Sequence, residues 1–272
     1  MTATLADVEG VVESLWPIAG AEAWDAVGLL SGDPASEVRR IHLAVDAVLD
    51  TVDEAVETGA DLLLVHHPLL LRGVTTVAET RYKGAVLARL IRAGCALLAA
   101  HTNADVVVDG TSAVLAGRLG LIRSRPLVPS SVDPAVGLGR VGDLVEPTTL
   151  GRFARGLADI LPATAQGIRV AGEYDQPVTR VALCAGAGDS LLGNPEVLAA
   201  DVYLTSDLRH HPASEARENA RVGRGPALVD VSHWASEWLW LDVAARQLRD
   251  ALPGVEVTVS ELRTDPWEFS IV

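Results

Sequence analysis

The sequence Asp61-Leu62-Leu63-Leu64-Val65-His66-His67-Pro68 predicts a buried β-strand that ends at two adjacent histidines. An apolar run at 41–45 predicts an earlier strand, and the segment 51–58, closed near Gly59, predicts a helix between the two. Two strands joined by a helix form a βαβ unit, in which the strands are parallel. The histidine pair is therefore expected at the carboxyl end of a parallel strand, where α/β proteins bind their ligands.

The neighbouring segments extend this alternation of strands and helices. An amphipathic helix over 5–16 stops at Pro17, and a later helix over 82–92 is capped by Gly94. A third strand, 96–100, runs into His101-Thr102-Asn103-Ala104-Asp105. Strands that alternate with helices imply a mostly parallel sheet with polar residues at its carboxyl edge.

The second half of the chain repeats this order. Strand 181–184 follows strand 41–45 at the same separation along the chain as Asp201 follows Asp61. His-His-Pro recurs at 210–212, and the pair His233 and Glu237 repeats the spacing of His101 and Asp105. We infer a duplicated α/β unit with a site between its halves, although an alanine- and valine-rich sequence can also align with itself by chance.

The expected fold class is α/β, with two similar, duplicated domains, mostly parallel sheets and the site in the cleft between them. The first half is expected to cover 1–125 and the second 126–272, with the C-terminal helix able to pack back on the first half. The proline-containing segment 124–143 has few long apolar runs and is the expected linker.

Composition and charge exclude several classes of protein. The chain of 272 residues has 36 acidic and 22 basic side chains, and its net charge of −14 at pH 7 repels nucleic-acid backbones and anionic membranes. No apolar run approaches the roughly 18 residues of a membrane helix, and the N-terminal segment lacks the features of an export signal. Cys95 and Cys184 stand in apolar stretches, as buried thiols do in a reducing compartment. We expect a cytoplasmic protein that binds neither membranes nor nucleic acid.

Three common catalytic motifs are also missing from the sequence. The only lysine, Lys83, is followed by Gly84 and Ala85, so the chain has no Gly-Lys-Ser/Thr phosphate-binding loop. The glycines at 186 and 188 lack the third glycine of a dinucleotide fingerprint, and Ser190 lacks the flanking glycines of a serine-hydrolase elbow.

Six of the seven histidines fall at strand ends, a distribution typical of a metal or catalytic site. His66 and His67 are adjacent, so their side chains diverge and are suited to two different ions. His233 and Glu237 are four residues apart, which places both on one face of a helix. With Asp105 these residues form a nitrogen and oxygen ligand set that suits zinc, manganese, iron(II) or nickel(II).

Each of these residues also has a plain structural interpretation. A single histidine at a strand end is usually a hydrogen-bonded structural residue, and His42, inside a strand, is expected to be one. His210, His211 and Asp207 mirror the first-half cluster and could support ligands, relay protons or only form a polar sheet edge. The spacing of tryptophans 234, 238 and 240 is typical of core or subunit-interface packing.

Five stretches stand in this order along the chain: Trp24-Asp25-Ala26-Val27-Gly28-Leu29, His66-His67-Pro68, His101-Thr102-Asn103-Ala104-Asp105, Thr205-Ser206-Asp207-Leu208-Arg209-His210-His211 and Ser232-His233-Trp234-Ala235-Ser236-Glu237. Taken together they resemble the Nif-three-like family, whose members are commonly labelled GTP cyclohydrolase I type 2 homologues. The sequence departs from the family pattern at Ala26, where asparagine is usual, and at Ser206, where glycine is usual.

The resemblance implies two similar α/β domains, a dinuclear metal centre in a cleft and a hexameric ring of subunits. Motif matching implies that the metal ligands are His66, His67, Asp105, His233 and Glu237. One ion would be held by His67 and Asp105 and the other by His66 and His233, with Glu237 bridging the two.

The expected function is a dinuclear hydrolase that uses two divalent cations per subunit and acts on a small molecule, GTP or a related nucleotide or phosphoester. His101 and His210 are the candidate proton carriers. The alternative is a metal-binding interaction or metal-handling protein without turnover, and a third possibility is that the histidines are only structural. The resemblance also leads us to expect a homo-oligomer, a hexamer.

Overall fold

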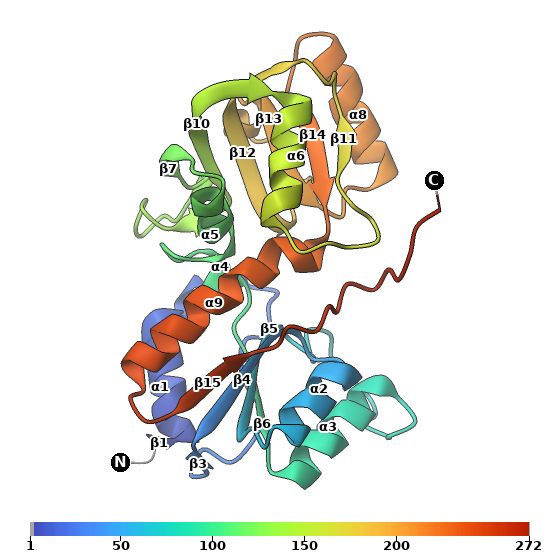
Figure 1. Cartoon of the computed structure of the whole chain (residues 1–272). Coiled ribbons are helices and arrows are strands. Elements are labelled where there is room, and N and C mark those ends of the chain that lie inside the picture. The colour runs from blue at the N-terminus through green and yellow to red at the C-terminus, as the bar shows by residue number, and fades with distance from the viewer. Residues whose placement is uncertain (1–2, 272) are drawn as a thin grey trace. The chain divides into compact units, whose positions relative to one another are not determined.

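The computed structural model describes residues 3–271, and their contacts divide the chain into two units (Figure 1). The first unit contains the residues up to Val107 together with Leu241–Thr264, and the second contains Val108–Trp240 together with the residues from Asp265 onward. The chain therefore passes from the first unit to the second, returns, and leaves again near its end. Both units are mixed α/β structures. No helix among residues 3–271 is long and apolar enough to cross a membrane.

The first unit is built on a five-stranded sheet of order β15-β4-β5-β6-β2, in which all neighbours are parallel except β2 and β6. Its elements are β1 (Ala3–Thr4), α1 (Leu5–Leu15), η1 (Ile18–Gly20), β2 (Gly28–Ser31), β3 (Glu37–Val38), β4 (Arg40–Asp46), α2 (Leu49–Glu57), β5 (Leu62–His67), α3 (Tyr82–Ala93), β6 (Ala96–Ala99), α4 (Thr102–Asp105) and β15 (Glu256–Val259). The predicted helices and strands of this half are confirmed, with small shifts at their ends.

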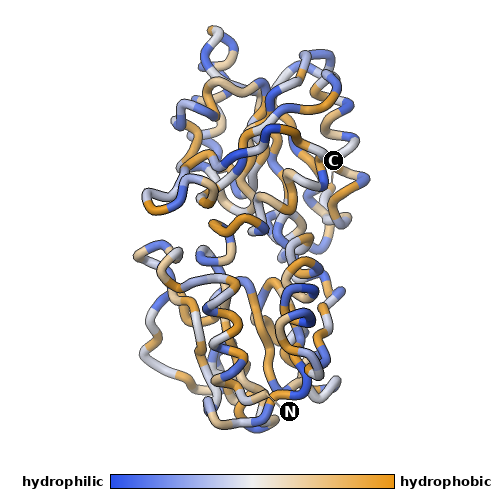
Figure 2. Tube along the Cα trace, turned by 90° about the vertical axis from the view of Figure 1, so that its left-hand side faces the viewer, coloured by the Kyte–Doolittle hydropathy of each residue, from blue (hydrophilic) through white to orange (hydrophobic). Residues whose placement is uncertain are grey.

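Both faces of the central strands in the first unit are covered. Leu63 and Val65 of β5 pack in one core cluster with apolar residues of α2 and α3, whereas Leu62 and Leu64 face the other side of the sheet. All four side chains are fully buried. A strand that is buried on both faces needs a continuous apolar sequence, which the run of leucines supplies. The apolar colouring follows the central strands in Figure 2.

The second unit is built on a six-stranded sheet of order β11-β14-β13-β12-β10-β7. Its elements are α5 (Thr111–Arg118), β7 (Ile122–Arg125), β8 (Val128–Pro129), β9 (Gly137–Leu138), β10 (Arg140–Thr149), α6 (Leu150–Ile160), β11 (Arg169–Ala171), β12 (Pro177–Ala187), η2 (Asp189–Leu191), α7 (Pro195–Leu198), β13 (Val202–Ser206), α8 (His210–Arg221) and β14 (Ala227–Val231). Helix α9 (His233–Ala251) begins here, and its residues from Leu241 belong to the first unit.

The expectation of mostly parallel sheets is wrong for the second unit. Only β12, β13 and β14 are parallel, and β11, β10 and β7 all join the sheet in antiparallel pairs. Two core clusters cover the two faces of this sheet, one including residues of α5 and α6 and the other residues of α7 and α8. Trp234 and Trp240 of α9 are buried, in agreement with the first of the two expected roles, core or subunit-interface packing, and Trp238 is partly buried against the core of the second unit.

The segment 124–143 is not a linker, because it forms β8, β9 and the start of β10 inside the second unit. Two of its glycines serve the tight turn between β9 and β10: Gly137 and Gly139 have φ values of 147° and 61°, which other residues rarely adopt. The buried guanidinium of Arg140 closes the turn by donating hydrogen bonds from Nη1 to the carbonyl oxygens of Gly137 and Gly139, at 2.7 and 2.8 Å.

The first two parallel strands of each unit share one hydrogen-bond pattern. Ile41 pairs with Leu62 in the first unit, and Val181 pairs with Val202 in the second, so both strands recur at the same separation along the chain. Asp61 Oδ2 accepts hydrogen bonds from the backbone N–H groups of residues 39 and 40, at 2.8 and 2.9 Å. Asp201 Oδ2 accepts the same two bonds from residues 179 and 180, both at 2.8 Å. In this register Ser206 and Asp207 correspond to the first histidine pair, and His210 and His211 instead begin α8.

We expect Asp61→Ala to lower the free energy of unfolding of the first unit by about 1 to 2 kcal/mol, because two backbone N–H groups lose their acceptor. The control is Asp53→Ala, whose carboxylate pairs with the exposed Arg89 at 3.1 Å and is expected to contribute less than about 0.5 kcal/mol. Urea unfolding, followed by hydrogen exchange in peptides of β4 and β5, measures both. Equal stability of the two variants would contradict this account of the strand junction.

Candidate metal centre

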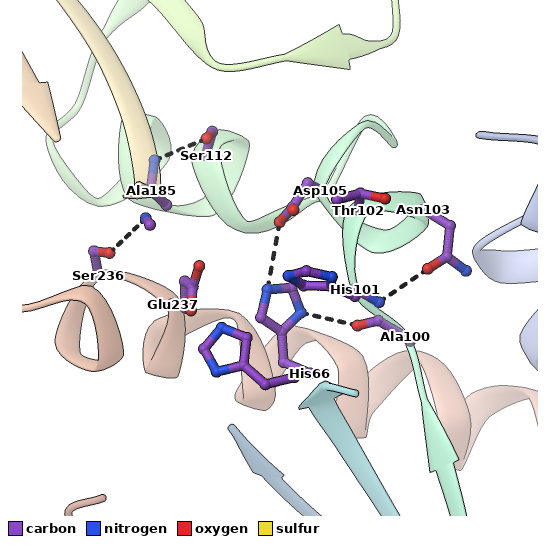
Figure 3. Close-up of polar contacts among 12 residues, drawn as sticks. His66, Ala100, His101, Thr102, Asn103, Asp105, Ser112, Ala185, Ser236 and Glu237 are labelled. Carbon is purple, nitrogen blue, oxygen red and sulfur yellow. Dashed lines mark hydrogen bonds and ion pairs between the residues drawn. The ribbon is translucent and has the colours of Figure 1, made fainter. Parts of the chain in front are cut away.

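Three histidine side chains meet at the carboxyl edge of the first sheet. His66 and His67 end β5, and His101 follows β6 directly before α4. One ring nitrogen of each lies within 4.8 Å of the others. Asp105, on α4, points at the same cluster, with Oδ1 3.6 Å from His66 Nε2 (Figure 3). The strand ends thus gather four potential metal ligands within one unit.

Each of these histidines is held by its Nδ1 atom. His66 Nδ1 lies 2.8 Å from the carbonyl oxygen of Ala100, which can only accept, so this nitrogen carries the proton (Figure 3). His67 Nδ1 lies 2.7 Å from Asp46 Oδ1, and His101 Nδ1 lies 2.9 Å from Asp25 Oδ1. Hydrogen bonds of this kind fix the tautomer and leave Nε2 as the nitrogen with a lone pair for a metal.

His42 shows what a structural histidine looks like in the same sheet. Its side chain is buried in β4, and both of its ring nitrogens are hydrogen bonded: Nδ1 to Thr258 Oγ1 at 2.8 Å and Nε2 to Glu54 Oε2 at 2.9 Å. Neither nitrogen is left to bind a ligand. The interpretation of His42 as structural agrees with this geometry.

A second donor pair lies in the second unit, at the start of α9. His233 Nε2 and Glu237 Oε1 are 3.0 Å apart, as expected for side chains one helical turn apart on the same face. His233 Nδ1 lies 2.7 Å from Asp207 Oδ2, which repeats the Nδ1 arrangement of the first unit. The predicted pairing of His233 with Glu237 on one helix face is therefore present.

Two backbone positions next to this pair are unusual. Asp207, directly after β13, has a positive φ of 57°, a conformation that Asp and Asn tolerate better than most residues. Gly186, near the end of β12, has a φ of 72°, and a Cβ atom there would lie 2.3 Å from Glu237 Oε1 and 3.2 Å from His233 Nε2. The donor pair thus needs both the bare backbone of Gly186 and the left-handed turn at Asp207.

The end of β12 is hydrogen bonded to side chains of α5, α9 and β13. The N–H of Gly186 donates to Ser236 Oγ at 2.9 Å, and Thr205 Oγ1 donates to the carbonyl oxygen of Gly186 at 3.0 Å. The N–H of Ala185 donates to Ser112 Oγ at 3.0 Å (Figure 3). The backbone beside His233 and Glu237 is therefore fixed from three elements.

The electrostatics of His233 favour a positive charge. Burial alone would lower its pKa, but the carboxylates of Glu237 and Asp207 outweigh burial and raise the pKa well above the ordinary value. His101 behaves in the opposite way. Burial and the neighbouring His66 lower its pKa, although Asp25 opposes the shift, so this imidazole is favoured in the neutral form.

The structure places the predicted site residues in two sets. His66, His67 and Asp105 lie together in the first unit, and His233 and Glu237 lie together in the second. His101, predicted as a proton carrier, also stands among the potential ligands. His210 and His211 are exposed at the start of α8, with ring centroids 5.2 Å apart, and belong to no metal-ligand group among residues 3–271.

Sequence reasoning missed the residues that orient the histidines. Asp46 was not singled out, although it ends β4 at the same sheet edge and the rule applied to the histidines points to it equally. Asp25 was seen only as part of a motif, and its carboxylate accepts from His101 Nδ1 and from both the N–H and the hydroxyl of Thr102. No signal in the sequence pointed to Gly186.

The donor set fits divalent transition metals. Imidazole nitrogens that are oriented from their Nδ1 side, together with carboxylate oxygens, are the ligands that zinc, manganese, iron(II) and nickel(II) share. The first unit offers His66, His67, His101 and Asp105, and the second offers His233 and Glu237. Either set can contribute to a metal site, and neither selects one metal.

Comparison of the sequence with known proteins finds a matching family. A family model described as Duf34/NIF3 (NGG1p interacting factor 3) matches residues 3–266. A protein of Streptomyces coelicolor named GTP cyclohydrolase 1 type 2 homolog is 49% identical over 269 residues, which cover 97% of this chain and 93% of the relative. A Mycobacterium leprae protein of the same name is 35% identical over 99% of this chain and 96% of its own length.

Solved structures agree with these matches. A hypothetical protein of Staphylococcus aureus superposes with a TM-score of 0.89 at 27% identity, over 99% of this chain and 100% of the other. Reduced HcgD from Methanocaldococcus jannaschii superposes with a TM-score of 0.79 at 25% identity, over 96% and 99% of the two chains.

We expect Gly186→Ala to weaken binding of Mn²⁺ or Zn²⁺ by about tenfold or more, because the new methyl group displaces the Glu237 carboxylate. Gly223→Ala is the matched control: its φ is 83°, so its backbone strain is similar, but no atom lies within 4 Å of the added Cβ. Isothermal titration calorimetry with each metal compares the two. The same loss in both variants would show that strain, and not the contact with Glu237, is responsible.

We expect Asp207→Asn to reduce metal affinity by roughly 10- to 100-fold, the range typical of lost support to a ligating histidine. Asparagine tolerates the positive φ at this position, so the backbone is preserved while the charge beside His233 Nδ1 is removed. Metal titration gives the affinity, and circular dichroism verifies the fold. An unchanged affinity would remove Asp207 from the site.

Proposed function

The chain belongs to the Duf34/NIF3 family, and on that premise we propose that it is a hydrolase that depends on two divalent metal ions. The observation that carries this proposal is that four histidines make the same kind of hydrogen bond through Nδ1. In each of them Nδ1 is bonded to a carbonyl or carboxylate oxygen, which directs Nε2 toward a ligand. In His233 the Nε2 atom faces Glu237, another proposed ligand, at 3.0 Å, whereas the two nitrogens of His42 bond to Thr258 and Glu54, outside the cluster.

We propose five metal ligands: His66, His67, Asp105, His233 and Glu237. His67 and Asp105 would hold one ion, and His66 and His233 the other, with the Glu237 carboxylate bridging them. Adjacent residues at a strand end diverge, which supports the assignment of His66 and His67 to different ions. Bound divalent ions lower the pKa of water toward neutrality and polarise the electrophilic centre of a substrate.

The pair of His101 and Asp25 is suited to proton transfer. Asp25 accepts the proton of Nδ1, so His101 Nε2 is the free basic atom, and the lowered pKa keeps the ring neutral. We propose that His101 accepts a proton from the attacking water and returns it to the leaving group. His210 stays a second candidate, although its exposed position on α8 gives it no partner comparable to Asp25.

The proposed substrate is GTP or a related nucleotide or phosphoester. The curated relatives are named GTP cyclohydrolase 1 type 2 homolog, which supports ring-opening hydrolysis of GTP as the first reaction to examine. The net charge of −14 repels an anionic substrate at long range. Four positive charges from two divalent ions reverse that field locally, so an anionic substrate is compatible with the loaded site.

We further propose that the two halves, 1–125 and 126–272, arose by duplication and that the subunits form a hexamer. The common register of β4 with β5 and of β12 with β13, and the equivalent hydrogen bonds of Asp61 and Asp201, support the duplication.

The test is metal content by elemental mass spectrometry, paired with a turnover assay on GTP and a panel of phosphoesters. We expect close to two ions per chain and turnover that chelation abolishes and metal restores. Glu237→Gln should lower turnover by at least about a hundredfold, since it removes the charge of the bridging ligand. The isosteric change Glu215→Gln on the exposed surface of α8 is the control and should leave turnover unchanged.

Two other results would contradict the hydrolase proposal and favour another function. Stoichiometric metal without turnover on any substrate would favour a metal-handling or interaction protein, in which Glu237→Gln still binds its partner. Folded protein that takes up no metal would show that the histidines are structural.

A further inference from the structure

A tryptophan with most of its side chain exposed borders the histidine cluster of the first unit. Trp24 is 60% exposed, whereas Trp16 and Trp240 are fully buried and Trp234 is 6% exposed. Its ring lies edge-on to His101, with centroids 5.9 Å apart and an interplanar angle of 76°. The His101 ring is in turn 5.1 Å from that of His66. The exposed indole of Trp24 therefore contacts His101, which in turn contacts the proposed metal ligand His66.

We propose that Trp24 is a stacking platform for a planar heteroaromatic ring, the base of a nucleotide substrate. The inference rests on the proposed function in one respect, namely that substrate binds at the histidine cluster. It goes beyond it by assigning recognition of the base to one residue.

The backbone on both sides of Trp24 is held in place. The Asp25 carboxylate accepts from the N–H of Ala26 at 2.7 Å and from the N–H of Thr102 at 3.0 Å. The N–H of Glu22 donates to Thr102 Oγ1 at 2.9 Å. The chain at 22–26 is thus bonded to the start of α4, which follows directly after His101. A rigid support costs a ligand less ordering entropy than a mobile side chain does.

The exposed indole of Trp24 is chemically suited to a planar aromatic ligand. An indole loses a large apolar area from water when a planar ring covers it, and stacking accepts any heteroaromatic base because every base has a π-face. Phosphate groups cannot make this contact, and in a chain of net charge −14 they are expected to bind at the metal ions instead. One end of a nucleotide would then be held by charge and the other by stacking.

The experiment compares two probes, guanosine 5′-monophosphate and ribose 5-phosphate, which share a sugar phosphate but differ by the base. Calorimetry on the full metal-loaded chain gives the ratio of the two affinities. We expect the wild-type protein to prefer the nucleotide, and Trp24→Ala to reduce that preference by about 5- to 150-fold while ribose 5-phosphate binding is unchanged. Trp24→Phe should retain part of the preference. Trp267→Ala, at an indole that is 62% exposed in the C-terminal segment, is the matched control.

Three outcomes would overturn the proposal: no preference for the nucleotide in the wild-type protein, an unchanged preference in Trp24→Ala, or an equal loss in Trp267→Ala. A shift of Trp24→Ala to a smaller assembly in gel filtration would also overturn it, because the indole would then be a subunit contact. Metal content and turnover are measured on the same samples. A protein that stacks the base but hydrolyses nothing would therefore refute the hydrolase proposal and leave this one standing.

Discussion

The hydrogen bond at the Nδ1 atom of each site histidine is the constraint on which the rest of the structure depends. An imidazole has two nitrogens, and only a partner on one side decides which of them is presented. Here the partners are the carbonyl oxygen of Ala100 and the carboxylates of Asp46, Asp25 and Asp207. Without these four acceptors neither the tautomer nor the orientation of the four rings would be fixed.

In the first unit, parallel strands bring two of these acceptors, Asp46 and Ala100, to the sheet edge where His66, His67 and His101 lie. Asp46 ends β4 and is paired in the sheet with His67, which ends β5. Ala100 and His101 follow β6, the next strand. In the second unit the histidine and its acceptor are brought together in another way. Asp207 has a left-handed backbone conformation, and the donor pair has room only because Gly186 carries no side chain. The two sets of donors thus share a chemical arrangement but not a local structure.

The sequence predicted the central strands, and all five proposed ligands were already candidates in it, because both leave strong local signals. The apolar run 62–65 is short and is preceded by a helix that closes near Gly59, which favours a strand buried on two faces, and polar residues at its end are conspicuous. The antiparallel strands of the second unit left no comparable signal, since proline and glycine in 124–143 suit a tight turn as well as a linker. The roles of Asp46 and Gly186 depend on contacts between residues distant in the sequence, such as Gly186 with Glu237. The sequence around each residue does not indicate such contacts.

The position of β15 has a consequence for synthesis of the chain on the ribosome. β4 lies between β5 and β15, yet β15 is made only after the whole second sheet. Until Glu256–Val259 emerge, β4 is an edge strand whose backbone groups on one side are open to pairing with another nascent chain. The strand order therefore leaves the free edge of Arg40–Asp46 exposed while the second sheet is made, and a chain that ends before Glu256 would keep that edge open.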